Sequence, residues 1–293
     1  MTATTSFRIA YQGEPGANSH LACLEVFPDC EPVAYATFED AFAAVESGEV
    51  RYGMIPIENS VAGRVADIHH LMPASTLHIV GEHFLRVRHQ LLGVKGAALS
   101  GIRTVASHVH ALGQCRKVIS ELKLRTVVAA DTAGSARELK ESGDPARAAI
   151  ATSLAAEIYG LEVLRADIED EDHNTTRFLL MAREADEAPA GNGAVVTTFL
   201  FRVRNVPAAL YKAMGGFATN GVNMTKLESY QLDGQFYATQ FYADIEGHPS
   251  ERRVQLAFEE LGFFTTHFRV LGIYPASPMR EEFARRAAAL HAE

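Results

Sequence analysis

Short apolar runs alternate with stretches of helical spacing through the first part of the chain. After Thr37, for example, Phe38, Ala41, Phe42 and Val45 recur at the spacing of one helix face. The predicted strands cover residues 7–11, 52–57, two stretches within 77–94, 103–106, 126–130 and 148–151. The predicted helices cover residues 19–24, 38–47, 64–71, 111–122, 131–140 and 152–159. This alternation predicts an α/β fold with a mostly parallel sheet covered by helices.

The rhythm changes after a linker-like segment at 184–193, whose sequence is EADEAPAGNG. A strand, a helix, two strands, a helix and a strand are predicted at 195–203, 207–219, 223–232, 236–245, 250–261 and 264–273. Asp233-Gly234 predicts the hairpin turn between the two middle strands, and Ser250 is the expected N-cap of the second helix. The βαββαβ order is typical of ferredoxin-like domains. A polar helix is expected at 278–293.

Polar turns follow the predicted strands of the first part at 12–19, 58–60, 107–110 and 131–135. Ligands of parallel α/β sheets bind beyond the carboxyl ends of the strands. The turn at 12–19 opens a helix, so its backbone amides and Ser19 either hold a carboxylate or phosphate or form a turn without a ligand. Several such turns in one sheet favour a small anionic ligand.

Single polar residues in these turns have two interpretations each. Ser107 and Thr132 either cap the helices that follow them or donate to an anion. Asn59 follows a predicted strand and offers both a donor and an acceptor to a ligand, or else forms an Asx-type turn.

A second polar cluster, His173 to Phe178, enters a predicted apolar strand. Thr175 and Thr176 supply hydroxyl groups, and Arg177 supplies a fixed positive charge. The preceding acidic run, 167–172, offers Arg177 a competing partner in Asp170, Glu171 or Asp172. Polar clusters at the mouth of a strand are common positions for functional sites.

Composition narrows the function classes. The net charge of −9 argues against nucleic-acid binding, and we expect neither a secretion signal nor a membrane span. Cys23, Cys30 and Cys115 form no CxxC pair, so we expect buried or partly buried thiols in a reducing cytoplasm. The histidines show no metal-ligand spacing, and no nucleophile or dinucleotide motif is present. These observations favour binding, or chemistry by hydrogen bonds and electrostatics.

The motifs together resemble those of monofunctional prephenate dehydratases with a C-terminal ACT regulatory domain. The resemblance covers residues 6–275, and no helical mutase domain precedes it, so we expect a single catalytic activity. The matching motifs are YQGEPGANS (11–19), IPIENSVAG (55–63), SHVHALGQC (107–115), DTAGSA (131–136), NTTRF (174–178) and GVNMTKLES (221–229).

The resemblance implies dehydration and decarboxylation of prephenate to phenylpyruvate, in phenylalanine biosynthesis, without a metal or organic cofactor. It implies a two-lobed catalytic domain like that of type II periplasmic binding proteins, followed by a ferredoxin-like ACT domain. The implied boundaries are 6–183 for the catalytic domain (lobe one 6–80 and 174–183, lobe two 85–172), 194–275 for the ACT domain and 276–293 for a terminal helix.

The resemblance also implies roles for individual residues. Thr176 is the donor to the leaving hydroxyl, either as an acid or as a hydrogen-bond relay, and Asn59, Ser107 and Gln114 line the catalytic site. The implied substrate-binding residues are Gly16, Ser19, Glu58, Ser60, Thr132, Ala133, Arg177 and Phe178.

Feedback inhibition by phenylalanine is implied at an ACT-mediated dimer or tetramer. The implied regulatory residues are Ala208, Ala209, Leu210, Asn223, Met224, Thr225, Glu228 and Ser229. The chain departs from the family pattern at Ala208, where the family usually has glycine, and at Tyr230-Gln231, where the family has Arg-Pro. Two alternatives stay open: an arogenate dehydratase, and a non-catalytic cytoplasmic sensor of amino acids or other small molecules.

Overall fold

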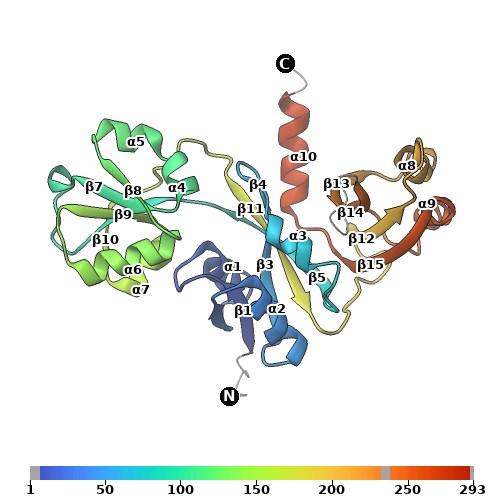
Figure 1. Cartoon of the computed structure of the whole chain (residues 1–293), viewed down its shortest axis with the longest axis horizontal. Coiled ribbons are helices and arrows are strands. Elements are labelled where there is room, and N and C mark those ends of the chain that lie inside the picture. Colours follow the sequence, from blue (N-terminus) through green and yellow to red (C-terminus); the bar gives the residue numbers. More distant parts are fainter. Residues whose placement is uncertain (1–6, 232–237, 291–293) are drawn as a thin grey trace. The chain divides into compact units, whose positions relative to one another are not determined.

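A computed structural model describes residues 7–231 and 238–290 of the chain (Figure 1). The chain forms two compact units. Unit 1 comprises Met1–Met72 and His83–Leu179, and unit 2 comprises Pro73–Glu82 and Leu180–Glu293. Among the described residues, no helix is both long and apolar enough to cross a membrane.

The first sheet lies mainly in unit 1. Its strands, in spatial order, are β2 (Glu31–Tyr35), β1 (Arg8–Gln12), β3 (Tyr52–Asn59), β11 (Thr175–Ala182) and β5 (His78–Arg86), and the short β4 (Gly63–Arg64) pairs with β3. The helices α1 (Asn18–Val26), α2 (Phe38–Ser47) and α3 (Ala66–Leu71) belong to this part of the chain. Strand β1 is parallel to both β2 and β3, so this portion matches the predicted parallel pairing.

The second sheet is mixed, not mostly parallel as expected. Its strands, in spatial order, are β10 (Glu162–Arg165), β6 (Gln90–Gly93), β9 (Arg147–Ala151), β7 (Thr104–Ser107) and β8 (Arg125–Val128). Strand β7 is parallel to β8 and β9, whereas β6 is antiparallel to β9 and β10. The antiparallel strands β6 and β10 are those by which the chain enters and leaves this sheet.

Helices cover both faces of the second sheet because the side chains of β9 alternate between them. Ala148 and Ile150 pack with α4 (Val109–Gly113) and α5 (Arg116–Glu121), and Ala149 and Ala151 pack with α6 (Thr132–Ser142) and α7 (Ser153–Tyr159). Figure 1 shows these two helix pairs on opposite sides of the strands.

Local sequence signals explain the best-predicted elements. The helix over 38–47 is confirmed with both ends: the Thr37 hydroxyl accepts from the Asp40 amide, and Gly48 ends the helix with a left-handed φ of 78°. The strands β2 and β10 were not predicted. One helix was expected over 111–122, but the structure has two short helices separated at Gln114 and Cys115.

The break in that helix has a visible cause. The carboxylate of Asp170 accepts hydrogen bonds from the backbone amides of Arg116 and Lys117, at 2.8 and 3.0 Å. The Gln114 carbonyl in turn accepts from the Asp170 amide at 2.6 Å. A segment remote in sequence therefore supplies the partners that a continuous helix would provide, and Gln114 lies at the junction.

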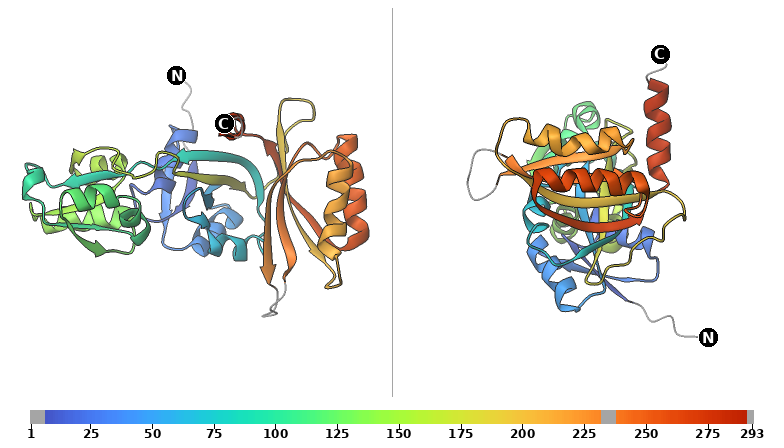
Figure 2. Two further views of the ribbon diagram at one scale, coloured as in Figure 1. Left: turned by 90° about the horizontal axis from the view of Figure 1, so that it is seen from above. Right: turned by 90° about the vertical axis from the view of Figure 1, so that its right-hand side faces the viewer.

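Unit 2 contains the predicted βαββαβ order. The elements are β12 (Val195–Val203), α8 (Ala209–Thr219), β13 (Met224–Gln231), β14 (Ala238–Glu246), α9 (Arg252–Phe264) and β15 (Thr265–Pro275). The sheet is antiparallel in the order β13-β14-β12-β15, and α8 and α9 lie side by side on one face (Figure 2). Phe199, Phe201 and Phe217 are buried in the core beneath these helices.

The hairpin turn and the second N-cap expected in unit 2 have different outcomes. The Asp233-Gly234 turn lies outside the described residues, although the two strands that flank it pair as expected. Ser250 is not the N-cap of α9; the structure places Glu251 there, and the helix begins at Arg252. The reason is that the Glu251 carboxylate accepts from the His248 amide at 2.7 Å and ties the turn before the helix.

The C-terminal helix α10 (Met279–Leu290) begins at a buried ion pair within unit 2. The side chain of Glu82 on β5 is completely buried and accepts from the Arg280 Nε and from the Ser277 amide. Arg280 Nη2 also lies 4.0 Å from the buried carboxylate of Asp244.

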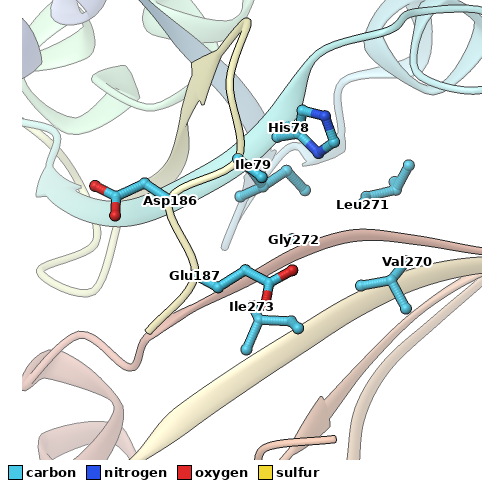
Figure 3. A pocket seen from close by; sticks show the side chains of 9 residues that line it. His78, Ile79, Asp186, Glu187, Val270, Leu271, Gly272 and Ile273 are labelled. Carbon is cyan, nitrogen blue, oxygen red and sulfur yellow. The ribbon is translucent and has the colours of Figure 1, made fainter. Parts of the chain in front are cut away.

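In another part of unit 2, strand β15 closely approaches the start of β5. A Cβ atom at Gly272 would overlap the Ile79 carbonyl oxygen, so only glycine fits there. Figure 3 shows the small pocket of about 100 Å³ beside this contact, with His78 and Glu187 among its lining residues. The pocket contains none of the residues predicted to bind a ligand.

Candidate functional site

Asn59 and Thr176 lie side by side at the ends of β3 and β11 in unit 1. The Asn59 Nδ2 group donates to Thr176 Oγ1 at 2.9 Å, although 117 residues separate them in the sequence. Strand β3 includes Glu58 and Asn59, which were expected in a turn, so both side chains are held by a sheet. The structure therefore brings together two of the four residues predicted to be catalytic.

The orientation of the Asn59 amide is fixed by the backbone. Its Oδ1 atom accepts hydrogen bonds from the amides of Val61 and Ala62, at 3.0 and 2.8 Å. The Nδ2 group must then point the other way, toward Thr176. The Asx-type turn considered as an alternative is thus present, and it orients the group that faces the second polar cluster.

The hydroxyl proton of Thr176 is available to a ligand. Because Thr176 Oγ1 accepts from Asn59, its own proton is directed elsewhere, and no described residue accepts it. A hydrogen bond received by a hydroxyl oxygen also polarises its O–H bond and strengthens it as a donor. The Thr176 side chain is only partly buried, so a ligand can reach it.

Asn174 and Gln114 extend the network. The second Nδ2 hydrogen of Asn59 is donated to Asn174 Oδ1 at 2.7 Å, and Asn174 Nδ2 donates to Gln114 Oε1 at 2.8 Å. Gln114 was predicted from the family motif, but Asn174, which is almost fully buried, was not assigned a role. Asn174 belongs to the NTTRF motif, but its contacts with Asn59 and Gln114 are visible only in the structure.

Ser60 ties the two strand ends together instead of facing a ligand. Its Oγ atom donates to the His173 carbonyl at 2.8 Å and accepts from the Thr175 amide at 2.9 Å. These bonds hold β11 next to β3 at the point where Thr176 emerges. Ser60 thus has a structural role in this structure, and its implied substrate-binding role stays a prediction.

Arg177 pairs with Glu58 rather than with the acidic run. The Arg177 Nη1 and Glu58 Oε1 atoms are 3.0 Å apart, and the Arg177 side chain is 3% exposed. Its guanidinium also lies 5.9 Å from the centre of the Phe84 ring. The Asp170 carboxylate instead accepts from the Arg116 amide at the start of α5, so the expected pairing of Arg177 with the acidic run is not observed. The ligand-binding role of Arg177 stays a prediction.

Several other predicted site residues are buried in the protein. Phe178 is 1% exposed and belongs to the core, and Ala133 is fully buried. The buried Ser107 hydroxyl donates to the Ile150 carbonyl at 2.7 Å. Neither Ser107 nor Thr132 caps a helix, because His108 and Asp131 occupy the two N-cap positions. The substrate contact expected of Phe178 stays a prediction.

The Gly16 turn packs against α7 instead of presenting a free amide. The Gly16 amide donates to the Nδ1 atom of His20 at 3.0 Å, and its carbonyl accepts from the Thr152 hydroxyl. A Cβ atom at Gly16 would lie 2.7 Å from Ala155 Cα, and φ is +91°, so glycine is required. Burial lowers the pKa of His20, consistent with a neutral ring that accepts this bond. Ser19, in the first turn of α1, is buried.

The described residues include no group of three or more His, Cys, Asp or Glu side chains able to hold a metal ion. Cys115, next to Gln114, is buried, and this burial, with smaller effects from Asp170 and Glu169, raises the pKa of its thiol. The thiol is therefore protonated at neutral pH and is a poor nucleophile. All three cysteines are free, with Cys23 buried and Cys30 partly buried, as predicted.

A pocket of about 440 Å³ in unit 2 contains part of the predicted regulatory set. Ala208, Ala209, Leu210 and Ser229 line it, together with residues that include Arg204 and Tyr211. The remaining predicted residues, Asn223, Met224, Thr225 and Glu228, are not among the residues that line it.

Comparisons with known proteins show which family this chain is similar to. A family model described as prephenate dehydratase matches residues 9–186. A "Bifunctional N-acyl-homoserine lactone acylase/prephenate dehydratase" of Komagataeibacter europaeus is 50% identical over 94% of this chain and 98% of its own. "Arogenate dehydratase/prephenate dehydratase 1, chloroplastic" of Arabidopsis thaliana is 38% identical over 93% of this chain and 73% of its own.

A solved structure extends the comparison to the whole fold. The prephenate dehydratase of Arthrobacter aurescens, in complex with L-Phe, matches with a TM-score of 0.84 and 29% identity. The match covers 97% of this chain and 98% of that one, so both units are included.

Proposed function

The chain belongs to the prephenate dehydratase family, a family of hydro-lyases, and from this we propose that it converts prephenate to phenylpyruvate beside Thr176. The observation that carries the proposal is the hydrogen bond from Asn59 to Thr176 Oγ1, which leaves the threonine proton directed at a ligand. Prephenate and arogenate dehydratases among the relatives support the same reaction class.

The reaction needs little besides a donor. The bond from the ring to its carboxylate breaks and releases carbon dioxide, and the electron pair completes the aromatic ring. The bond to the ring hydroxyl breaks at the same time, and the departing oxygen takes up a proton to leave as water. Negative charge therefore develops on one oxygen, and a hydrogen bond aimed at that oxygen stabilises the transition state.

Thr176 acts as a hydrogen-bond donor rather than as a free acid in this proposal. An alcohol is a weak acid, so full transfer of its proton is unfavourable unless another group replaces it. Polarisation by Asn59 strengthens donation without that transfer. The final proton then comes through Thr176 from water or directly from water.

The test of the activity is a comparison of substrates. Purified protein is incubated with prephenate and, separately, with arogenate, and the two kcat/KM values are compared. We expect phenylpyruvate from prephenate with the higher kcat/KM. A higher value for arogenate would assign the chain to the arogenate dehydratases, and binding without turnover of either would support the sensor alternative.

We further propose that unit 2 is an ACT domain that binds phenylalanine at the pocket formed by Ala208–Leu210 and Ser229. Its βαββαβ order and the L-Phe complex of the Arthrobacter aurescens relative support this proposal. Because a ligand that binds only the folded state stabilises it, saturating phenylalanine should raise the Tm by several degrees and inhibit turnover. Differential scanning fluorimetry with and without phenylalanine measures the first effect. An unchanged Tm at saturating phenylalanine would contradict the proposed regulatory site.

Ala208 offers a sharper test, because the backbone there suits glycine. Its φ of 60° lies in the left-handed region, and it precedes α8 as the N-cap. Ala208→Gly relieves this conformation, at some cost in unfolded-state entropy, and should raise the free energy of unfolding by about 0.5 kcal/mol. Removing a methyl group from the pocket should also tighten phenylalanine binding.

The matched control is Ala209→Gly, one residue later and within α8, where glycine should destabilise the helix by about 1 kcal/mol. Urea unfolding measures both changes. Equal destabilisation by the two substitutions would contradict the assignment of strain to Ala208.

The expected oligomer and cytoplasmic location stay predictions. We propose a dimer or tetramer formed through unit 2, and analytical ultracentrifugation of the purified protein measures which of them forms.

A second candidate activity follows from the name of one relative. The Komagataeibacter europaeus protein, 50% identical over almost its whole length, is named as an N-acyl-homoserine lactone acylase as well as a prephenate dehydratase. Release of homoserine lactone from an N-acyl-homoserine lactone would give this chain the same second activity. If the chain has only the single activity expected from the sequence, homoserine lactone should be released no faster with the protein than in buffer alone.

A further inference from the structure

We propose that His89 is a positioning residue for the dehydration, which holds the side-chain amide of Gln114 so that its NH₂ group faces the ligand. This inference rests on the proposed function. His89 stands outside the motifs that the sequence comparison singled out, and it lies directly before β6. Its Nε2 atom is 2.9 Å from Gln114 Oε1.

The direction of donation along the hydrogen-bond network determines where the oxygen and the NH₂ group of the Gln114 side chain lie. The network begins at the backbone amides of Val61 and Ala62, which can only donate, so Asn59 Oδ1 accepts and Asn59 Nδ2 donates. Asn174 must then accept with Oδ1 and donate with Nδ2. Each amide orientation follows from the one before it.

Gln114 therefore receives two donors on one oxygen. Asn174 Nδ2 donates to Gln114 Oε1 at 2.8 Å, and an accepting Oε1 requires that His89 Nε2 carries a proton and donates as well. The Nε2 group of Gln114 then points away from both partners. No described residue accepts from it. The network thus ends in two available donors, the hydroxyl of Thr176 and the amide of Gln114.

His89 is held firmly enough to perform this role. Its side chain is 4% exposed, and its backbone amide donates to Glu169 Oε2 at 3.0 Å. Burial lowers the pKa of the imidazole, which the hydrogen bond to Gln114 and the nearby Glu169 only partly offset. A neutral ring with its proton on Nε2 satisfies Gln114 without placing a charge beside the network.

Without His89, the Gln114 side chain loses one of the two contacts that set its rotation. Gln114 lies at the break between α4 and α5, where the helix no longer restrains it. With only the Asn174 contact left, the amide is less firmly oriented, and whenever its oxygen faces the ligand it would repel a departing hydroxide. The effect should appear in kcat more than in KM, because the charge develops only in the transition state.

Paired substitutions separate hydrogen bonding from packing. His89→Phe keeps a ring of similar size without a donor, and His89→Gln restores an N–H donor. We expect His89→Phe to lower kcat about 10-fold, the equivalent of one neutral hydrogen bond, with KM changed less than kcat. His89→Gln should recover most of the loss. His70→Phe and His70→Gln, at an exposed histidine, are the controls.

Two results would overturn the inference. Full activity in His89→Phe would show that the donor is not needed. Equal losses in His89→Phe and His89→Gln would show that the ring acts through its packing alone.

A spectroscopic measurement tests the hydrogen bond independently of turnover. The ¹⁵N shifts of labelled histidine, with His89 assigned by its disappearance in His89→Gln, report which ring nitrogen carries the proton. We expect the Nε2–H form at neutral pH, and the Nδ1–H form would contradict the proposal. If the wild-type protein did not act on prephenate, the proposed function would fail, whereas the tautomer would still test the contact between His89 and Gln114.

Discussion

Thr176→Val should lower kcat for phenylpyruvate formation about 10²–10³-fold, the loss typical of one donor aimed at a developing oxyanion. Valine has nearly the shape of threonine, so β11 and its neighbours should keep their packing. The substitution removes only the hydroxyl that Asn59 polarises. KM should change much less, because the hydroxyl acts on charge that appears in the transition state.

Two further substitutions control this experiment. Thr176→Ser keeps the hydroxyl and should stay within about 10-fold of the wild type, since only a methyl group is lost. Thr175→Val alters the adjacent residue, whose hydroxyl donates to the His173 carbonyl at 3.3 Å, and should leave turnover nearly unchanged. If Thr176→Val retained full turnover, Thr176 would not be the donor.

Glu82→Ala should lower the free energy of unfolding by about 3 kcal/mol, because it removes the main partner of a mostly buried cation. The Glu82 side chain is completely buried and accepts from two nitrogens of Arg280, at 2.6 and 2.9 Å. Arg280 is 17% exposed, so water cannot replace the lost carboxylate well. The nearby Asp244 keeps the loss at the lower end of the range for broken buried pairs.

Equilibrium unfolding in urea measures this change, and the chain offers a matched control. Glu282 pairs with Arg286 one helical turn away on the exposed side of α10. Glu282→Ala should cost no more than about 0.5 kcal/mol, because solvent screens an exposed pair. Similar losses in the two variants would show that the Glu82 pair contributes no more than a surface pair.

The sequence predicted the elements whose signals are local. Helix α2 has its cap, its apolar spacing and its terminal glycine within twelve residues, and the order of unit 2 follows from alternating strands and helices. The break after α4 was missed because it depends on Asp170, which is remote in sequence. The strands β2 and β10 were missed because their exposed and partly exposed residues lack a clear apolar pattern.

The candidate site was predicted in part. The motifs identified Asn59, Gln114 and Thr176. In the structure Asn59 contacts Thr176 directly, and Asn174 links Asn59 to Gln114. His89 carried no sequence signal, because a lone histidine before an apolar strand is indistinguishable from a core residue. Its role depends on which atom of Gln114 it contacts, and that is visible only in three dimensions.

Several residues expected to bind the substrate have polar groups that contact the protein and support the site. Gly16, Ser60 and Arg177 have their polar groups engaged by other parts of unit 1. Motif residues near a site can therefore be retained for the geometry that they impose. A sequence motif does not distinguish that role from direct contact with a ligand.

In the proposed mechanism, Asn59 and Thr176 act as one unit, in which the amide orients and polarises the hydroxyl. The most direct test is kcat for phenylpyruvate formation in the wild type, Asn59→Ala, Thr176→Val and the double variant. If the residues act together, the double variant should lose no more than about 3-fold beyond Thr176→Val alone. Losses that multiply in the double variant would show that the two side chains contribute independently and would contradict the account.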